Sequence, residues 1–248
     1  MSNFDIKFNP TIVDNFFTNP DVIRSFGLNL PKEKDKDGHW PGERSEELYL
    51  IDNDFNHCLI MKILSTHFDL RHVHVTWERS NITFQVIKPF DDVKDSLKNI
   101  GWVHQDEPGN LVGLIYLTPN ADLNSGTSIY KIKPEEEKNY LRWGTNTEKN
   151  TLYTSGKIKE DDYNEAVKKH NDRFVETIRV QNVYNRMITY DSNHFHKANS
   201  FFTGTEDRMT LVFFIKNINV DKFPVERTYD DLNFDSSLQR RINYLNNE

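Results

Sequence analysis

The stretch LVGLIYLTP, residues 111–119, is a nearly continuous apolar run of the length expected for a buried β-strand. Four further runs rich in β-branched and aromatic residues also predict strands. They are HVHVTWERSNITFQVI (72–87), GTSIYKI (126–132), NVYNRMITY (182–190) and RMTLVFFIKNI (208–218). These runs lack the regular strand–helix alternation of a parallel doubly wound sheet. The sequence therefore predicts a mainly β fold with flanking helices, an antiparallel sandwich or jelly roll.

Helices are expected mainly near the N-terminus. VDNFFTNPDVIRSFGLNL (13–30) predicts a strand or turn followed by a helix, and DFNHCLIMKILSTHF (54–68) has a helical apolar stripe. EDDYNEAVKKHNDRFVETI (160–178) also predicts a helix, whereas the polar stretch 33–45 predicts a loop.

The chain is expected to form a single domain, because no repeat, low-complexity tract or linker divides residues 1–248. We expect a helical front at 1–70 and a jelly-roll core at 71–220, interrupted by an insertion at about 131–175. The charged tail, 221–248, is expected to contain a short helix near SLQRRINYL.

Charge and composition restrict the class of partner. The chain has 31 basic and 38 acidic residues, a net charge of −7, which disfavours nucleic acid and anionic membranes but leaves room for a local basic mouth. A single cysteine, Cys58, excludes an internal disulfide framework and indicates a reducing, cytoplasmic setting. The N-terminal MSNFDIKFNP lacks the apolar core of a signal peptide, and no run approaches the roughly 18 residues of a membrane helix. The expected partner is a small-molecule or protein substrate.

A candidate metal site begins in GWVHQDEPGN, residues 101–110, where His104 and Asp106 are two residues apart. In an extended strand, residues two apart point to the same face. Two histidines and one carboxylate with open positions suit non-haem Fe(II), although such a short motif is by itself more often a polar turn. The segment ITYDSNHFHKANSFF offers His194 and His196 as the third ligand. Both would share a face of an extended strand, so alternation leaves the choice open.

Arg208 begins an apolar strand 12 residues after His196. Burying the charge of an arginine in a strand costs free energy unless the charge is paired. The planar guanidinium group pairs best with a carboxylate, through two parallel hydrogen bonds. Three other residues are left open between structural and site roles. Trp40 and Trp102 are expected to be packing residues, and the alternative is that they line the entrance of a substrate site. Gln85 is expected either to face a cofactor or to make a structural hydrogen bond.

An HxD triplet followed by a distant histidine and then an arginine resembles the Fe(II)/2-oxoglutarate-dependent dioxygenases, in particular small prolyl-hydroxylase-like members from phages and marine bacteria. LVGLIYLTPNADLNSGTSIY is similar to the family segment around its glycine turn, with one glycine where many members have two. YNRMITYDSNHFHKA is similar to the family's distal-histidine strand, so the resemblance covers roughly residues 10–216. It implies a double-stranded β-helix fold.

Carried over to this sequence, the resemblance implies that iron is bound by His104, Asp106 and His196, which form the catalytic centre. It favours His196 over His194 because the family's ligand follows an apolar residue and precedes a small or basic one, as in FHKA.

The resemblance also implies a cosubstrate site. Arg208 is expected to bind the distal carboxylate of 2-oxoglutarate and Tyr116 to hydrogen-bond the same group, while Thr210 lies on the same strand face as Arg208 and is expected to help.

The activity implied is an Fe(II)- and 2-oxoglutarate-dependent oxidoreductase that consumes O2. It would hydroxylate a protein side chain or small metabolite while 2-oxoglutarate is decarboxylated to succinate and CO2. Two alternatives stay open. One is a cupin-like divalent-metal hydrolase or isomerase, which has no need of a cosubstrate at Arg208, and the other is a non-catalytic binding module on the same fold.

Overall fold

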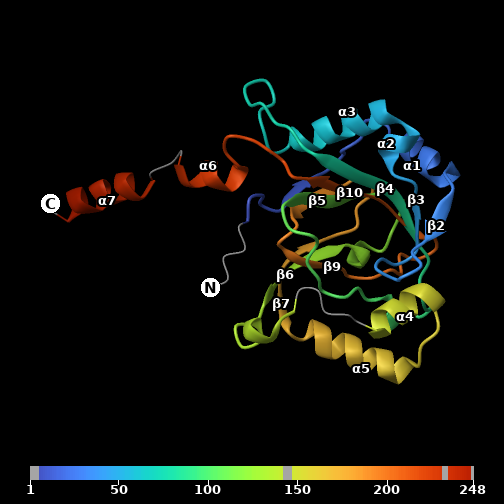
Figure 1. Ribbon diagram of the computed structural model, residues 1–248. Helices are drawn as coiled ribbons and strands as arrows, with labels where there is room; N and C mark the ends of the chain where they lie inside the picture. The colour runs from blue at the N-terminus through green and yellow to red at the C-terminus, as the bar shows by residue number, and fades with distance from the viewer. Residues whose placement is uncertain (1–5, 142–146, 231–233, 247–248) are drawn as a thin grey trace.

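Two facing antiparallel sheets form the body of the protein in the computed structural model, which describes residues 6–141, 147–230 and 234–246 (Figure 1). The larger sheet has the strand order β1-β8-β5-β10-β4-β3-β2, and the smaller one has the order β7-β6-β9. The larger sheet contains β1 (Thr11–Val13), β2 (Lys32–Lys34), β3 (Glu43–Ser45), β4 (Arg79–Ile87), β5 (Asn110–Tyr116), β8 (Met187–Asp191) and β10 (Arg208–Lys216). The smaller sheet contains β6 (Thr127–Ile132), β7 (Phe174–Val180) and β9 (Phe195–Ala198). The predicted antiparallel, mainly β architecture is confirmed.

Strand β10 occupies the centre of the larger sheet, where it pairs with β4 on one side and β5 on the other. Its side chains alternate between two environments, as a fully buried strand requires. Leu211, Phe213 and Ile215 belong to the core under the N-terminal helices. Arg208 and Val212 instead line a cavity between the two sheets. A single strand therefore supplies both the main core and the floor of the cavity.

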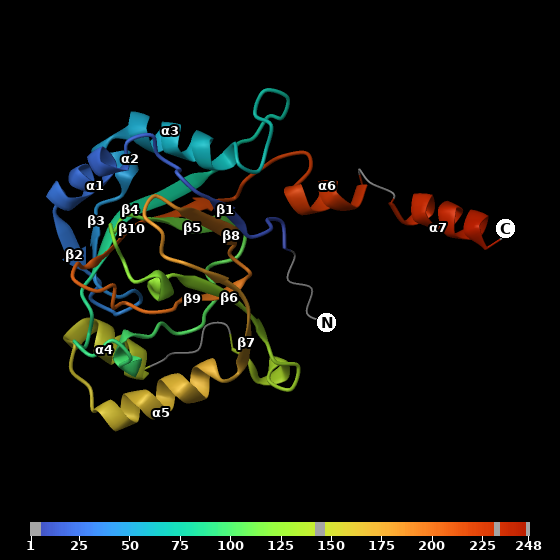
Figure 2. The ribbon, with the colours of Figure 1, turned by 180° about the vertical axis from the view of Figure 1, so that it is seen from behind.

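Helices cover the outer sides of both sheets (Figure 1). The outer face of the larger sheet is covered by α1 (Pro20–Asn29), α2 (Leu48–Ile51) and α3 (Asn53–Leu64). The smaller sheet is flanked by α4 (Thr147–Ser155) and α5 (Glu160–Asn171), while α6 (Pro224–Asp230) and α7 (Phe234–Leu245) run away from the body (Figure 2). Short 3-10 turns occur at Leu97–Asn99, Leu123–Ser125 and Glu137–Asn139. None of the helices in the described ranges has the length and apolar character to cross a bilayer.

The front of the chain is less helical than expected, because it contributes β1, β2 and β3 to the larger sheet. The predicted loop at 33–45 contains most of the β2–β3 hairpin. Its polar composition hid these strands, since strands near a sheet edge need not alternate apolar and polar residues. The strand predicted at 72–87 begins only at Arg79.

The helix predicted at 160–178 ends at Asn171, and the chain continues as β7. Pairing of β7 with β6, from Ile132↔Phe174 to Thr127↔Val180, prevails over the helical pattern. Residues 1–5, 142–146 of the predicted insertion and 231–233 and 247–248 of the predicted tail lie outside the described residues.

Helix α5, part of the predicted insertion, fastens the segment that carries the HxD triplet. Nε1 of Trp102 donates to the Tyr163 hydroxyl at 2.9 Å. The Asn171 side chain accepts a hydrogen bond from the backbone N–H of Val103 at 3.0 Å and donates one to the carbonyl of Gly101 at 3.0 Å. The insertion therefore positions residues 101–103 directly before His104.

We expect Tyr163→Phe to lower the free energy of unfolding by about 1–3 kcal/mol, because the buried indole N–H of Trp102 loses its acceptor. Urea denaturation measures this loss, and Tyr49→Phe, at an exposed tyrosine, is the matched control with no change expected. Equal stability of Tyr163→Phe and the wild type would contradict the proposed anchoring.

Candidate metal centre and adjoining cavity

His104 and His196 are joined by a reciprocal pair of backbone hydrogen bonds. The N–H of His104 donates to the carbonyl of His196 at 3.0 Å, and the N–H of His196 donates to the carbonyl of His104 at 2.9 Å. The N–H of Asp106 then donates to the carbonyl of Ser192 at 3.1 Å. The HxD segment thus lies antiparallel to β9, although its pairing with β9 is an isolated bridge and not a named strand.

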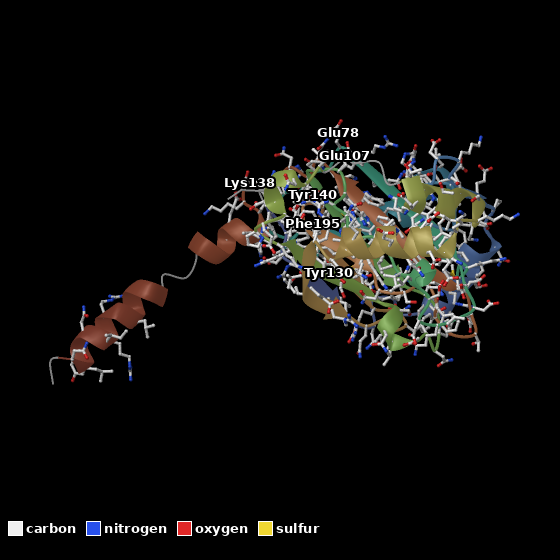
Figure 3. All side chains as sticks on the ribbon, turned by 90° about the horizontal axis from the view of Figure 1, so that it is seen from below. Glu78, Glu107, Tyr130, Lys138, Tyr140 and Phe195 are labelled. Atoms are coloured by element: carbon white, nitrogen blue, oxygen red, sulfur yellow. The ribbon has the colours of Figure 1, made fainter. Side chains whose placement is uncertain are left out.

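The neighbour of His196 anchors the opposite side of β9. Phe195 belongs to an aromatic cluster with Tyr130, Phe174 and Tyr140, and its ring centroid lies 5.0 Å from that of Tyr140 (Figure 3). Because consecutive residues of a strand point to opposite faces, this anchoring directs His196 into the space between the sheets.

The three predicted ligand side chains converge. Asp106 Oδ1 lies 3.9 Å from Nε2 of His104, and Asp106 Oδ2 lies 3.3 Å from Nε2 of His196. One potential ligand atom from each residue lies within 4.8 Å of the other two. Two imidazoles and a carboxylate at this separation can converge on one divalent ion, and this mixed set suits Fe(II).

Each imidazole is oriented by the carbonyl two residues before it. Nδ1 of His104 donates to the carbonyl of Trp102 at 2.8 Å, and Nδ1 of His196 donates to the carbonyl of His194 at 3.0 Å. Since a carbonyl can only accept, Nδ1 of both rings carries the proton. In the neutral rings Nε2 therefore presents its lone pair on the Asp106 side, which is the tautomer that binds a metal.

Enclosure by protein and, to a smaller extent, the nearby His196 lower the pKa of His104 to about 4. The ring is nonetheless open to the cavity, since 52% of its side-chain surface is exposed. His104 is consequently neutral at physiological pH and needs to lose no proton to coordinate a metal.

His194 does not join the cluster. Strand β9 begins at Phe195, and His194 lies in a turn closed by its N–H donating to the carbonyl of Asp191 at 2.9 Å. His194 and His196 would share a face only in an extended strand through both residues, and the turn at His194 breaks that condition. His194 contributes its carbonyl to the orientation of His196, and its own Nε2 is buried without a hydrogen-bond partner among the described residues.

The cluster opens into a cavity of about 290 Å³ between the sheets. Besides the three candidate ligands, its lining includes Trp40, Arg44, Gln85, Trp102, Thr127, Lys149, Tyr153, Tyr190, Phe201 and Arg208.

Arg208 is buried in this cavity with only 2% of its surface exposed. Its Nε donates to the carbonyl of Ser125 over a long 3.4 Å, and its Nη2 has no hydrogen-bond partner within the part of the chain that the structure describes. Burial lowers the pKa of Arg208, but a guanidinium stays charged in proteins. An unpaired buried charge is strongly destabilising, so this arrangement indicates a site for an anionic ligand.

Tyr116 and Thr210 lie beside Arg208. The Tyr116 ring centroid is 5.8 Å from Cζ of Arg208, but the Tyr116 hydroxyl is hydrogen-bonded at 2.9 Å to Thr127, which itself lines the cavity. Thr210 is fully buried, and its hydroxyl has no partner among the described residues. Of the predicted cosubstrate residues, Arg208 therefore lines the cavity and Tyr116 has its hydroxyl already bonded.

Several cavity residues were not predicted. Tyr190 packs its ring 4.7 Å from that of His196, and its place in β8, two residues after the inward-facing Ile188, is the pattern that could have identified it. Arg44 and Lys149 lie in polar stretches without any such pattern. Gln85 makes a structural hydrogen bond, in which its Nε2 donates to the carbonyl of Pro41 at 2.7 Å, and it also lines the cavity.

Trp40 and Trp102 also line the cavity. Trp102 is a packing residue as well, through its hydrogen bond to Tyr163.

We expect His196→Ala to weaken binding of Mn(II) or Co(II), measured by calorimetry, by more than the roughly 10- to 100-fold that loss of an outer hydrogen-bond partner costs. His194→Ala should retain the wild-type affinity within a few-fold, because the backbone carbonyl that orients His196 remains. The reverse pattern would make His194 the ligand.

The double-stranded β-helix inferred from the sequence is confirmed by its similarity to HygX from Streptomyces hygroscopicus, solved with nickel, 2-oxoglutarate and hygromycin B. The identity is 10%, the TM-score is 0.50, and the match covers 85% of this chain and 84% of HygX. Two further structures superpose less closely. One is SnoN, the non-heme alpha ketoglutarate-dependent epimerase from nogalamycin biosynthesis, at 10% identity and a TM-score of 0.46, covering 92% of this chain and 86% of SnoN.

The other is a prolyl hydroxylase from Trichoplax adhaerens in complex with a fragment of hypoxia inducible factor. It has 12% identity and a TM-score of 0.41, and the match covers 89% of this chain and 86% of that chain. No curated protein matches the sequence. A family described as "Family of unknown function (DUF6445)" matches residues 8–200, most of the chain, and the protein belongs to that family.

Proposed function

We propose that this protein is an Fe(II)- and 2-oxoglutarate-dependent oxygenase. The observation that carries the proposal is the unpaired, buried guanidinium of Arg208 in the same cavity as the cluster of His104, Asp106 and His196. A ligand that binds a metal at one end and an arginine at the other would explain both the cluster and the buried arginine. The dianion 2-oxoglutarate has that chemistry.

The donor set fits Fe(II). The two histidines offer Nε2 lone pairs, because their Nδ1 protons are held by backbone carbonyls, and Asp106 adds a carboxylate between them. Three protein ligands leave coordination positions for a chelating cosubstrate and oxygen. His104, Asp106 and His196 would thus be both the metal ligands and the catalytic centre.

The charges also fit. Fe(II) with Asp106 carries one net positive charge, and a bound 2-oxoglutarate dianion would leave one negative charge. Arg208 cancels that charge in a buried setting, where pairing matters most. Its Nη2 would donate to the distal carboxylate. Thr210 follows two residues later on the same strand, and its hydroxyl has no partner among the described residues, but it is not one of the residues that line the cavity. Tyr116 acts on this site through Thr127, to which its hydroxyl is bonded.

The bound metal and cosubstrate would supply oxidative decarboxylation of 2-oxoglutarate to succinate and CO2, coupled to hydroxylation of a second substrate. The protein orients the reactants and limits the access of water. Apolar side chains on the cavity wall, including Trp102, Val212 and Phe214, exclude water from the space beside the ligands. A cupin-like hydrolase or isomerase would use the same three ligands but gives the buried Arg208 no ligand.

We expect the wild-type protein to develop a weak visible charge-transfer band when Fe(II) and 2-oxoglutarate are added without oxygen. Arg208→Met should weaken 2-oxoglutarate in this titration by roughly 10- to 100-fold, because a charged hydrogen bond is lost, while Fe(II) affinity measured separately changes little.

Arg71→Met, which changes an exposed arginine, is the matched control and should leave the titration as in the wild type. The absence of a band in the wild type would refute the oxygenase assignment. An equal loss of iron and 2-oxoglutarate in Arg208→Met would refute the role given to Arg208.

A further inference from the structure

The cavity is lined by three cationic side chains, Arg44, Lys149 and Arg208, and by a single carboxylate, Asp106, among the residues that the structure describes. This local excess of positive charge occurs in a chain whose net charge is −7. Cosubstrate and iron account for Asp106 and Arg208 in the proposed function. Arg44 and Lys149 remain without a role in it.

Arg44 is held rigidly at the cavity wall. It lies on β3 in register with Gln85 of β4, and its Cζ stacks 4.6 Å from the ring centroid of Trp40. Gln85 fixes the same loop by donating to the carbonyl of Pro41. A guanidinium ordered by stacking and by its neighbours loses little entropy when it binds a ligand.

Donors on this wall lack acceptors. Nε of Arg44 and Nε1 of Trp40 are buried and have no hydrogen-bond partner in the described ranges of the chain. Burial lowers the pKa of Arg44 to about 10, partly offset by Asp106 and Asp35, so it is still charged at neutral pH.

Lys149 brings a second cation from α4, an element on the other side of the cavity. Its Nζ lies 5.9 Å from the ring centroid of Tyr153, and both residues line the cavity. Burial lowers the pKa of Lys149. Lys149 lines the same cavity as the three candidate metal ligands, so its ammonium group can bind a substrate held in that cavity.

We propose that the second substrate of this site is a small organic anion whose carboxylate or phosphate group is bound by Arg44 and Lys149. The inference rests on the proposed function, in which Arg208 is already paired with 2-oxoglutarate. Arg44 and Lys149 are two further cations in a partly buried cavity, and an anionic ligand would compensate their charge. The cavity of about 290 Å³ would have to hold 2-oxoglutarate as well, which favours a small molecule as the second substrate.

The test uses the full chain loaded with Ni(II) and saturated with 2-oxoglutarate, in a buffer free of other oxyanions. Inorganic phosphate and citrate are titrated by calorimetry, with glycerol as the uncharged control. We expect at least one of the two anions to bind saturably and glycerol not to bind. Arg44→Met and Lys149→Met should each raise the dissociation constant of that anion by about tenfold, while Arg71→Met leaves it unchanged.

The affinity for 2-oxoglutarate should be unaffected in Arg44→Met and Lys149→Met. Weaker 2-oxoglutarate in Arg44→Met would assign Arg44 to the cosubstrate and overturn the inference. Anion binding that is absent from the wild type, or unchanged in both variants, would overturn the inference and leave the oxygenase proposal standing. Failure of the wild type to bind 2-oxoglutarate would overturn both. If circular dichroism shows Arg44→Met to be unfolded, Lys149→Met, on a different element, decides.

Discussion

The reciprocal backbone hydrogen bonds between His104 and His196 are the constraint on which the site depends. They place two segments that are distant in sequence side by side and direct both imidazoles to one side. The extended backbone also supplies the carbonyls that accept from each Nδ1. The approach is so close that a Cβ at Gly101 would lie 2.6 Å from the carbonyl oxygen of Ala198. Glycine at this position allows the HxD segment to meet β9.

A second constraint is electrostatic. Among the residues that the structure describes, neither Nη2 of the buried Arg208 nor Nε of Arg44, which lines the same cavity, has a hydrogen-bond partner. Each arrangement costs stability in the absence of a ligand, because a desolvated charge lacks compensation. Asp106 is the one carboxylate against three cations among the described residues that line the cavity, and His104 is neutral. The cavity is thus arranged for anions, and the proposed cosubstrate and second substrate would restore the balance.

The strands of the core were predictable because β5 and β10 are long apolar runs that only a buried strand accommodates. The candidate ligands and Arg208 could be singled out because a polar side chain in or beside a buried strand costs free energy unless it has a partner. Their roles remain predictions. The sequence could not separate His194 from His196, because the turn that precedes β9 has no clear pattern in it. Arg44 and Lys149 could not be found, because their polar surroundings resemble any solvated surface and only the tertiary fold brings them to the cavity.

A crystal structure of the protein grown without oxygen in the presence of Fe(II) and 2-oxoglutarate tests the central claim most directly. We predict one metal ion bound by Nε2 of His104, Nε2 of His196 and the carboxylate of Asp106, with the distal carboxylate of 2-oxoglutarate on Nη2 of Arg208. A metal ion bound elsewhere, for example by Asp35, Asp37 and His39, which also lie close together, would contradict the account. So would a 2-oxoglutarate molecule that leaves Arg208 without a partner.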